Sequence, residues 1–182
     1  LARGRMSQAH GLLARSLQDF AHDPDILWLA VEEARRLGEP KRLERLAARE
    51  YLIEVPRPEL ALWLADRHAV RSTPAAGEAV LRRSLEYYPL HPGLWECLGR
   101  ALSAQGRERE MEAERSYRKA LLLSPGFAQA HLNLGALLFQ QRDLQGAEAE
   151  FREALRLDPG YAKASENLEL LERLKGPGPG RP

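Results

Sequence analysis

The side chains in this sequence best suited to chemistry are its histidines and its single cysteine. The five histidines are His10, His22, His68, His91 and His131. No two of them are four residues apart on one predicted helix, the spacing that lets two imidazoles share a metal ion. Cys97 is the only cysteine, so an internal disulfide is excluded and no second thiol could resolve an oxidised form. These residue types therefore predict neither a metal site nor a redox site.

Motifs that bind phosphate or activate a nucleophile do not occur in the sequence either. It has no glycine-rich phosphate loop and no nucleophile elbow. Asp66 and His68 lie two residues apart on a predicted helix, so they point to different faces and cannot act as a pair. An activity has to be argued from a site, and we find none. We expect no enzymatic activity, no cofactor and no metal in this chain.

Composition predicts a helical domain of ordinary globular character. The chain has 182 residues, of which 29% are charged and 44% hydrophobic, and its net charge is +1. Because no basic block stands out, we expect no nucleic-acid partner. No apolar run approaches the roughly 18 residues that span a bilayer, so we expect no membrane insertion within the chain. The first residue is Leu1, which fits a segment of a longer protein. The compartment therefore stays open, with the cytoplasm slightly favoured.

The sequence contains an internal repeat. Residues 92–125 and 128–159 share small, aromatic and proline residues at matching positions. The matching sets are Leu98, Gly99, Ala113, Tyr117, Ala120 and Pro125 in the first copy, and Leu134, Gly135, Ala147, Phe151, Ala154 and Pro159 in the second. A repeat of about 34 residues predicts stacked pairs of helices. Glycines inside helices predict close helix crossings, because any side chain there would push the two axes apart.

These positions resemble the tetratricopeptide repeat family. That family places an aromatic residue and Leu-Gly on a first helix, Ala-aromatic-Ala on a second, and a proline after it. Two departures are visible. His131 stands where the first copy has the aromatic Trp95, and Gly99 to Ala113 spans 14 positions against 12 in the second copy, which predicts a longer turn around Gly106. The resemblance implies an all-α fold, in which tandem helix-turn-helix repeats form a right-handed superhelical solenoid.

The same pattern predicts the organisation of the whole chain as one repeat domain over residues 1–174. The predicted parts are an N-terminal helix at about 6–21, helix pairs at 24–56, 58–89, 92–125 and 128–159, a capping helix at 161–174, and a disordered Gly/Pro tail at 175–182. Pro125 and Pro159 are predicted to end one helix and to open the next, with Ser124 and Asp158 as N-caps.

The resemblance also implies a binding face. In the family, the first helix of each pair lines a concave groove. Carried onto this chain, the candidate groove residues are Glu96, Arg100, Gln129, Leu132, Asn133, Ala136, Phe139, Lys163 and Asn167. This mixture of polar and apolar side chains suits an extended peptide or a helix laid in the groove. We therefore predict a scaffold or adaptor that binds a protein or peptide partner.

One subclass of the family clamps a C-terminal carboxylate with lysine, asparagine and arginine side chains. Asn133 and Lys163 match that set, but Glu96 stands where a lysine is expected and would repel a carboxylate. We therefore do not expect that clamp, although Arg100 with Lys163 could attract an acidic group. Two alternatives stay open. One is a regulatory or targeting segment of a larger protein, such as a sugar transferase or a polymer-assembly enzyme, and the other is a self-assembling structural module.

Overall fold

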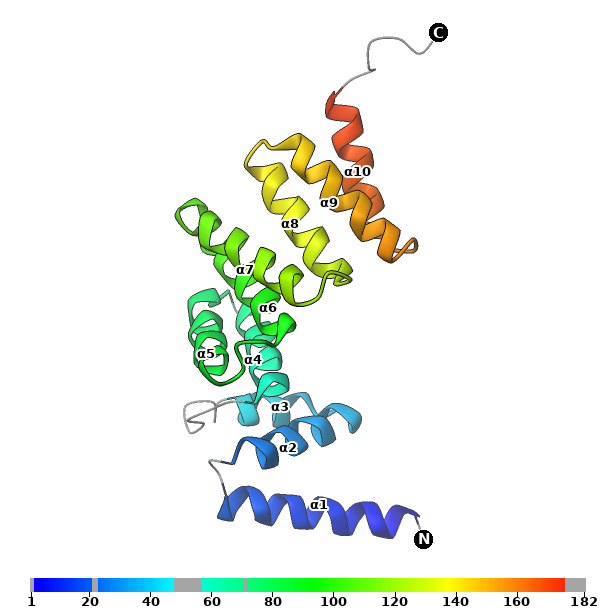
Figure 1. The fold of residues 1–182 in the computed structure, drawn as a ribbon. Helices are drawn as coiled ribbons and strands as arrows, with labels where there is room; N and C mark the ends of the chain where they lie inside the picture. The colour runs from blue at the N-terminus through cyan, green and yellow to red at the C-terminus, as the bar shows by residue number, and fades with distance from the viewer. Residues whose placement is uncertain (1, 21–22, 48–56, 71, 176–182) are drawn as a thin grey trace. The chain divides into compact units, whose positions relative to one another are not determined.

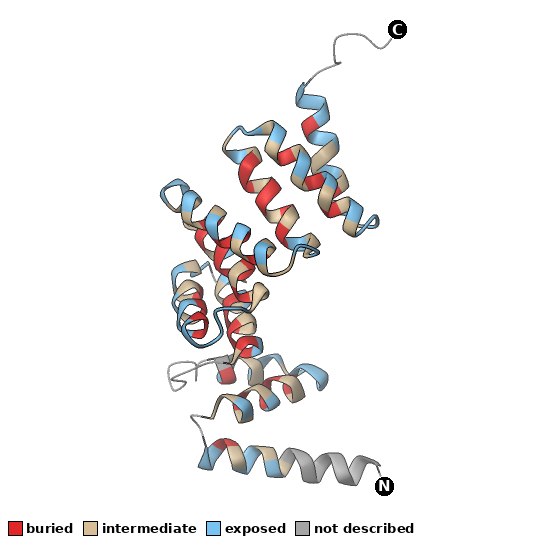
Figure 2. Cartoon of the chain, in the orientation of Figure 1, coloured by how far each residue is buried: buried red, intermediate tan, exposed pale blue. Residues whose placement is uncertain are grey.

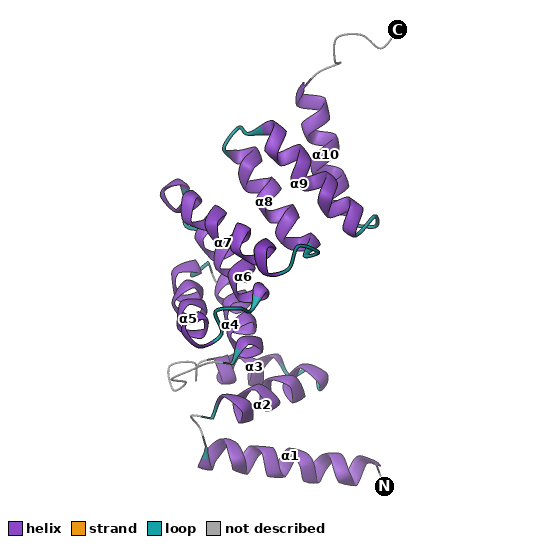
Figure 3. Cartoon of the chain, in the orientation of Figure 1, coloured by secondary structure: helices purple, strands orange, loops and turns teal. Residues whose placement is uncertain are grey.

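The computed structural model describes residues 2–20, 23–47, 57–70 and 72–175, and all regular structure in these ranges is helical (Figures 1 and 3). Ten α-helices and one short 3-10 helix are present there. The chain divides into two compact units, Leu1–Pro89 and Leu90–Pro182, each of which is described by itself. The end of the predicted 24–56 pair and nearly all of the predicted 175–182 tail lie outside the described residues.

In its described residues the first unit has five helices, most of which begin at a proline. They are α1 (Ala2–Asp19), α2 (Pro24–Arg36), α3 (Pro40–Ala47), α4 (Pro58–Val70) and α5 (Pro74–Tyr87). Proline suits the first turn of a helix, where its missing N–H would have no partner. The helices α2 and α4 begin at Pro24 and Pro58, the first residues of the predicted pairs 24–56 and 58–89. The N-terminal helix starts four residues earlier and ends two residues earlier than predicted.

The core of the first unit is built around α2. Leu27, Ala30, Val31 and Ala34 recur at three- and four-residue intervals, and all four are fully buried. They pack with Leu17 of α1 and with buried leucines of α3 and α4. The apolar stripe of α2 is therefore covered by side chains of α1, α3 and α4.

The second unit carries the two copies of the repeat and a last helix. Its elements are α6 (Pro92–Ser103), the 3-10 helix η2 (Arg107–Arg109), α7 (Glu110–Leu123), α8 (Ala128–Gln140), α9 (Leu144–Leu157) and α10 (Ala162–Lys175). The pairs α6–α7 and α8–α9 pack along their lengths, with buried residues where the two helices meet (Figure 2). The predicted helix pairs are confirmed here.

Glycine in α6 and α8 allows an aromatic ring from the partner helix to lie against the backbone. A Cβ atom on Gly99 would lie 2.6 Å from the Tyr117 ring, and one on Gly135 would lie 2.7 Å from the Phe151 ring. Both rings are almost completely buried. No side chain fits in this space, which explains two glycines inside helices despite a cost of about 1 kcal/mol each relative to alanine.

The extra residues of the first copy are accommodated in its turn. Gly106 has φ 115° and is followed by η2, which precedes α7. The shorter turn of the second copy instead places Arg142 at φ 70°, a left-handed conformation that non-glycine residues seldom adopt. The predicted longer turn around Gly106 is confirmed.

The predicted N-caps at Ser124 and Asp158 are wrong. Both residues are C-caps, of α7 and α9, and each donates its backbone N–H to an alanine carbonyl one turn earlier. Pro125 and Pro159 then lie in the turns, and α8 and α10 begin three residues after them. The residues between the two helices form the turn in which the chain reverses direction, so the next helix starts only after the proline.

Helix α10 packs against α9 at the end of the second unit. Leu171 is fully buried, whereas Glu166, Glu169, Glu172 and Arg173 are exposed. Lys175 of α10 forms an ion pair with Glu148 of α9. None of the described helices has both the length and the apolar character that a membrane crossing requires.

Candidate functional site

The nine predicted site residues all lie on α6, α8 and α10, but they differ in accessibility. Arg100, Gln129 and Lys163 are exposed, while four others are half-buried: Asn133, Ala136, Phe139 and Asn167. Glu96 is 5% exposed and Leu132 only 1% exposed. Leu132 belongs to the interior, so its side chain cannot contact a partner and its assignment to the groove is corrected.

A continuous chain of hydrogen bonds links α6, α8 and the turn before α10. Asn133 Nδ2 of α8 donates to Glu96 Oε1 of α6 over 2.6 Å. Gln129 Nε2 donates to Asn133 Oδ1 over 3.1 Å. The hydroxyl of Tyr161, just before α10, donates to Gln129 Oε1. These bonds fix which way each amide points, because each amide oxygen accepts from one neighbour.

The buried carboxylate of Glu96 is satisfied on both oxygens. Cys97 Sγ donates to Oε2 over 3.3 Å, and Asn133 donates to Oε1. Arg100 Nη2 donates to Cys97 Sγ over 3.1 Å, and its Nε lies 4.0 Å from Glu96 Oε1. A buried charge is tolerated only when it is paired and hydrogen-bonded. This site therefore presents the cation of Arg100 outward, while the anion of Glu96 stays inside.

Burial keeps the titratable hydroxyl and thiol groups of this region protonated. Burial, and next the charge of Glu96, raises the pKa of the Cys97 thiol, which therefore is not a reactive thiolate. Burial raises the pKa of Tyr117 to about 12. Burial, followed by the charges of Glu96 and Asp158, also raises the pKa of Tyr161. Near neutral pH all three groups remain hydrogen-bond donors.

An apolar pocket of about 270 Å³ lies beside this polar chain, between α8 and α10. Its lining residues are Ala136, Phe139, Gln140, Phe151, Asn167 and Leu170. Three of them were predicted site residues. Gln140, Phe151 and Leu170 were missed, and so was Tyr161, which precedes its helix. Gln140 could have been predicted from its spacing, because Ala136, Phe139 and Gln140 lie three and four residues apart and therefore share one face of α8.

His131, which replaces the family aromatic, ties α8 to its surroundings. Its Nε2 donates to the Pro125 carbonyl over 3.0 Å, and its Nδ1 lies 2.6 Å from Glu150 Oε2 of α9. The imidazole thus belongs to the scaffold. Among the residues that the structure describes, no cluster of three or more His, Cys, Asp or Glu side chains could hold a metal ion.

Comparison with known proteins adds to this geometry. The family model described as "Tetratricopeptide repeat" matches residues 98–162, which cover both glycine–aromatic crossings. Residues 98–162 therefore carry tetratricopeptide repeats. No curated protein sequence matches it.

Solved tetratricopeptide repeat structures share the fold. YrrB, titled a protein "with an unusual peptide-binding site", superimposes with a TM-score of 0.73 at 15% identity, over 92% of this chain and 86% of that one. The first repeat domain of Spaghetti (RPAP3), bound to the HSP90 peptide SRMEEVD, gives 0.61 at 16% identity, over 69% and 99%. A mutant O-GlcNAc transferase from Thermobaculum terrenum gives 0.58 at 26% identity, over 62% of this chain and 21% of that one.

Proposed function

We propose that the second unit binds a peptide across α6, α8 and α10, and that the protein acts as an interaction adaptor. The observation that carries this proposal is the hydrogen-bonded chain from Glu96 to Tyr161, which orders polar side chains of α6, α8 and the turn before α10. Tetratricopeptide repeats are protein-interaction modules, and solved relatives include peptide complexes.

The polar part of this face favours a partner that accepts hydrogen bonds. Asn133 Nδ2 and Gln129 Nε2 each use one N–H within the chain and retain a second one. Arg100 and Lys163 add exposed cations, whereas the carboxylate of Glu96 is buried. Backbone carbonyls and an acidic side chain of a peptide supply the matching acceptors.

The apolar part favours a partner with one large hydrophobic side chain. The pocket beside Phe139 has an apolar floor at Phe151 and amides at Gln140 and Asn167. A side chain placed there would be desolvated while the amides hold the neighbouring backbone, an arrangement typical of anchor residues. We therefore propose a short acidic peptide with one large apolar residue.

The experiment is a selection from a displayed random peptide library, followed by titration of the selected peptides. Replacing Arg100 and Lys163 together by glutamine should weaken the selected peptides by about tenfold, which corresponds to about 1.4 kcal/mol. The loss should be larger at low salt, because surface charges are then less screened. Phe139→Ser should weaken the same peptides by removing the apolar wall.

The matched control neutralises Arg107 and Arg115, which are exposed on η2 and α7. This double variant removes the same charge outside the proposed face, so it should bind like the parent. Circular dichroism checks the fold of every variant. The proposal fails if the control loses affinity while the Arg100 and Lys163 variant keeps it, or if the library yields no binding peptide.

A second candidate function is a targeting segment of a larger enzyme. The observation in its favour is the match to the O-GlcNAc transferase, in which the shared part makes up 21% of that chain. The reading frame that surrounds this sequence in its gene tests this candidate directly. A catalytic domain encoded there would support it, and its absence would leave the adaptor.

A further inference from the structure

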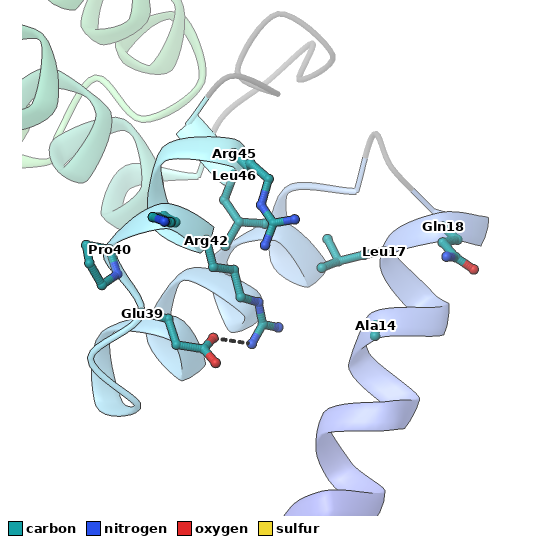
Figure 4. Close-up of a pocket in the computed structure, with 9 residues that line it drawn as sticks. Ala14, Leu17, Gln18, Glu39, Pro40, Arg42, Arg45 and Leu46 are labelled. Carbon is teal, nitrogen blue, oxygen red and sulfur yellow. Dashed lines mark hydrogen bonds and ion pairs between the residues drawn. The ribbon is translucent and has the colours of Figure 1, made fainter.

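The first unit contains a second, larger cavity that the proposed function does not use. A space of about 730 Å³ separates α1 from α3 and the turn before it (Figure 4). This volume falls within the range of about 300–1,000 Å³ that is typical of ligand sites. Leu17 of α1 and Leu46 of α3 lie at its base and are almost completely buried, while Ala14 lines it from an exposed position on α1. The cavity therefore has an apolar floor.

The charged residues of the cavity fall into two groups. Arg42 is already neutralised, because Nη2 lies 2.7 Å from Glu33 Oε2 and Nη1 lies 3.0 Å from Glu39 Oε2. Lys41 and Arg45 are exposed, and neither forms an ion pair with any side chain that the structure describes. The net charge offered to a ligand at the rim is therefore positive.

The distance between these two cations determines how far apart the anionic groups of a matching ligand must be. Lys41 and Arg45 are four residues apart on α3, so they lie on one face of the helix. Their positions differ by about 6 Å along the helix axis. Two acidic residues at positions i and i+2 of an extended segment are separated by about 6.6 Å, which matches that rise.

We propose that the cavity between α1 and α3 binds an acidic peptide segment of a protein partner, with leucine-like side chains between its carboxylates. Charge complementarity with Lys41 and Arg45 selects the acidic residues, and the floor of Leu17 and Leu46 selects the apolar ones. This site is distinct from the proposed peptide face. It lies in the first unit, and α3 is the second helix of its pair, whereas the peptide face lies in the second unit on α6, α8 and α10.

A nucleic acid is the competing anionic partner, and the cavity favours it less. A phosphate backbone would satisfy Lys41 and Arg45 but would leave the leucine floor without an apolar partner. Nucleic-acid binding also draws on many phosphate contacts from an extended basic surface. With 27 basic and 26 acidic residues, the chain as a whole shows no such excess of positive charge.

The test is a fluorescence anisotropy titration of the whole chain with the labelled peptide GSELEELEGS. Lys41→Glu with Arg45→Glu should raise the dissociation constant by at least about tenfold, through like-charge repulsion. Ala14→Trp should also raise it by at least about tenfold, because the indole occupies the cavity from an exposed position and leaves the charges unchanged. The peptide GSESEESEGS, which keeps the charge but lacks leucine, should bind at least about tenfold more weakly than GSELEELEGS.

The control variant Arg107→Glu with Arg115→Glu makes the same change in net charge on α7 and the turn before it, and should bind like the parent. Circular dichroism confirms that the variants fold. The proposal is overturned if the parent does not bind GSELEELEGS, or if both double variants weaken it equally. It is also overturned if Ala14→Trp has no effect, or if single-stranded RNA binds this rim as tightly as the peptide.

Discussion

The environment of Glu96 differs from the sequence-based expectation. Its position in the repeat predicts a carboxylate pointing into a groove, where it would repel an anionic partner. In the structure the side chain is 5% exposed and accepts hydrogen bonds from Asn133 and Cys97. Its hydrogen bond therefore fixes the orientation of the Asn133 amide, while Arg100 supplies the exposed charge of this face. A buried acceptor that occupies one N–H of Asn133 also weakens the case for a carboxylate clamp.

The glycine–aromatic contact gives a prediction for a single residue. Gly135→Val should lower the free energy of unfolding by about 1–3 kcal/mol, because the new side chain would overlap the buried Phe151 ring. The measurement is a denaturant titration followed by circular dichroism. Gly11→Val is the matched control, since no atom lies within 4 Å of a Cβ placed on Gly11. Equal stability of the two variants would show that α8 and α9 do not cross so closely in solution.

At the scale of helices, local signals predicted most elements, and long-range contacts account for what was missed. The helices α2, α3 and α4 each begin at a proline, a signal that local sequence contains. The same reasoning failed at Pro125 and Pro159, because the proline there belongs to a turn whose length depends on where the next helix packs. The predicted face lies on α6, α8 and α10, but Leu132, which was placed on it, lies inside. Adjacent helix positions point about 100° apart, so when Asn133 faces outward Leu132 turns toward the interior, and the two cannot share the predicted face.

The contacts across the face could not be predicted from local sequence. Glu96 and Asn133 are 37 positions apart, and Gln129 and Tyr161 are 32 apart. Each pair meets only because successive repeats stack, and the sequence pattern does not fix the rotation between them. Tyr161 lies in the turn before α10, outside the helix-face spacing that was used to choose candidates.

The last helix provides a prediction at this scale. A chain that ends at Gly160 loses α10, with its buried residues Ala164 and Leu171 and its ion pair between Lys175 and Glu148. The apolar surface of α8 and α9 beneath it becomes exposed, so the product should aggregate or lose helix content. Circular dichroism and light scattering measure both. A chain that ends at Lys175 keeps α10 and should behave like the full sequence, whereas equal solubility and helicity of the shorter product would disprove the capping role.

At the scale of the whole molecule, each of the two compact units has its own buried core. In the first unit, leucines of α1, α3 and α4 surround α2. In the second, the glycine–aromatic crossings at Gly99 and Gly135 are internal to their helix pairs. The two proposed binding sites are divided in the same way, since one lies on α6, α8 and α10 and the other between α1 and α3. Each proposed site is therefore contained within a single unit.

This division predicts how the molecule unfolds. A protein comprising residues 90–175 should fold by itself, because both repeat copies and the capping helix are complete within it. Its denaturant-induced unfolding should be cooperative. If the two units unfold separately, the whole chain should show two transitions, and one of them should have the same midpoint as the unfolding of the fragment. Circular dichroism of the fragment and of the whole chain provides the comparison. A fragment without helical signal would show that the second unit depends on the first.

The turn at Gly106 has a consequence for how this chain can change over evolution. Two additional residues enter the first repeat copy there, yet both copies place a glycine against a buried ring in the same way. The added length is taken up by Gly106 and η2, whose residues are mostly exposed, and does not reach the crossing. Insertions at such surface turns are tolerated because they disturb few buried groups. A difference of two residues between α6 and α7 therefore leaves the glycine–aromatic crossing unchanged, so repeats of unequal length can pack in the same way.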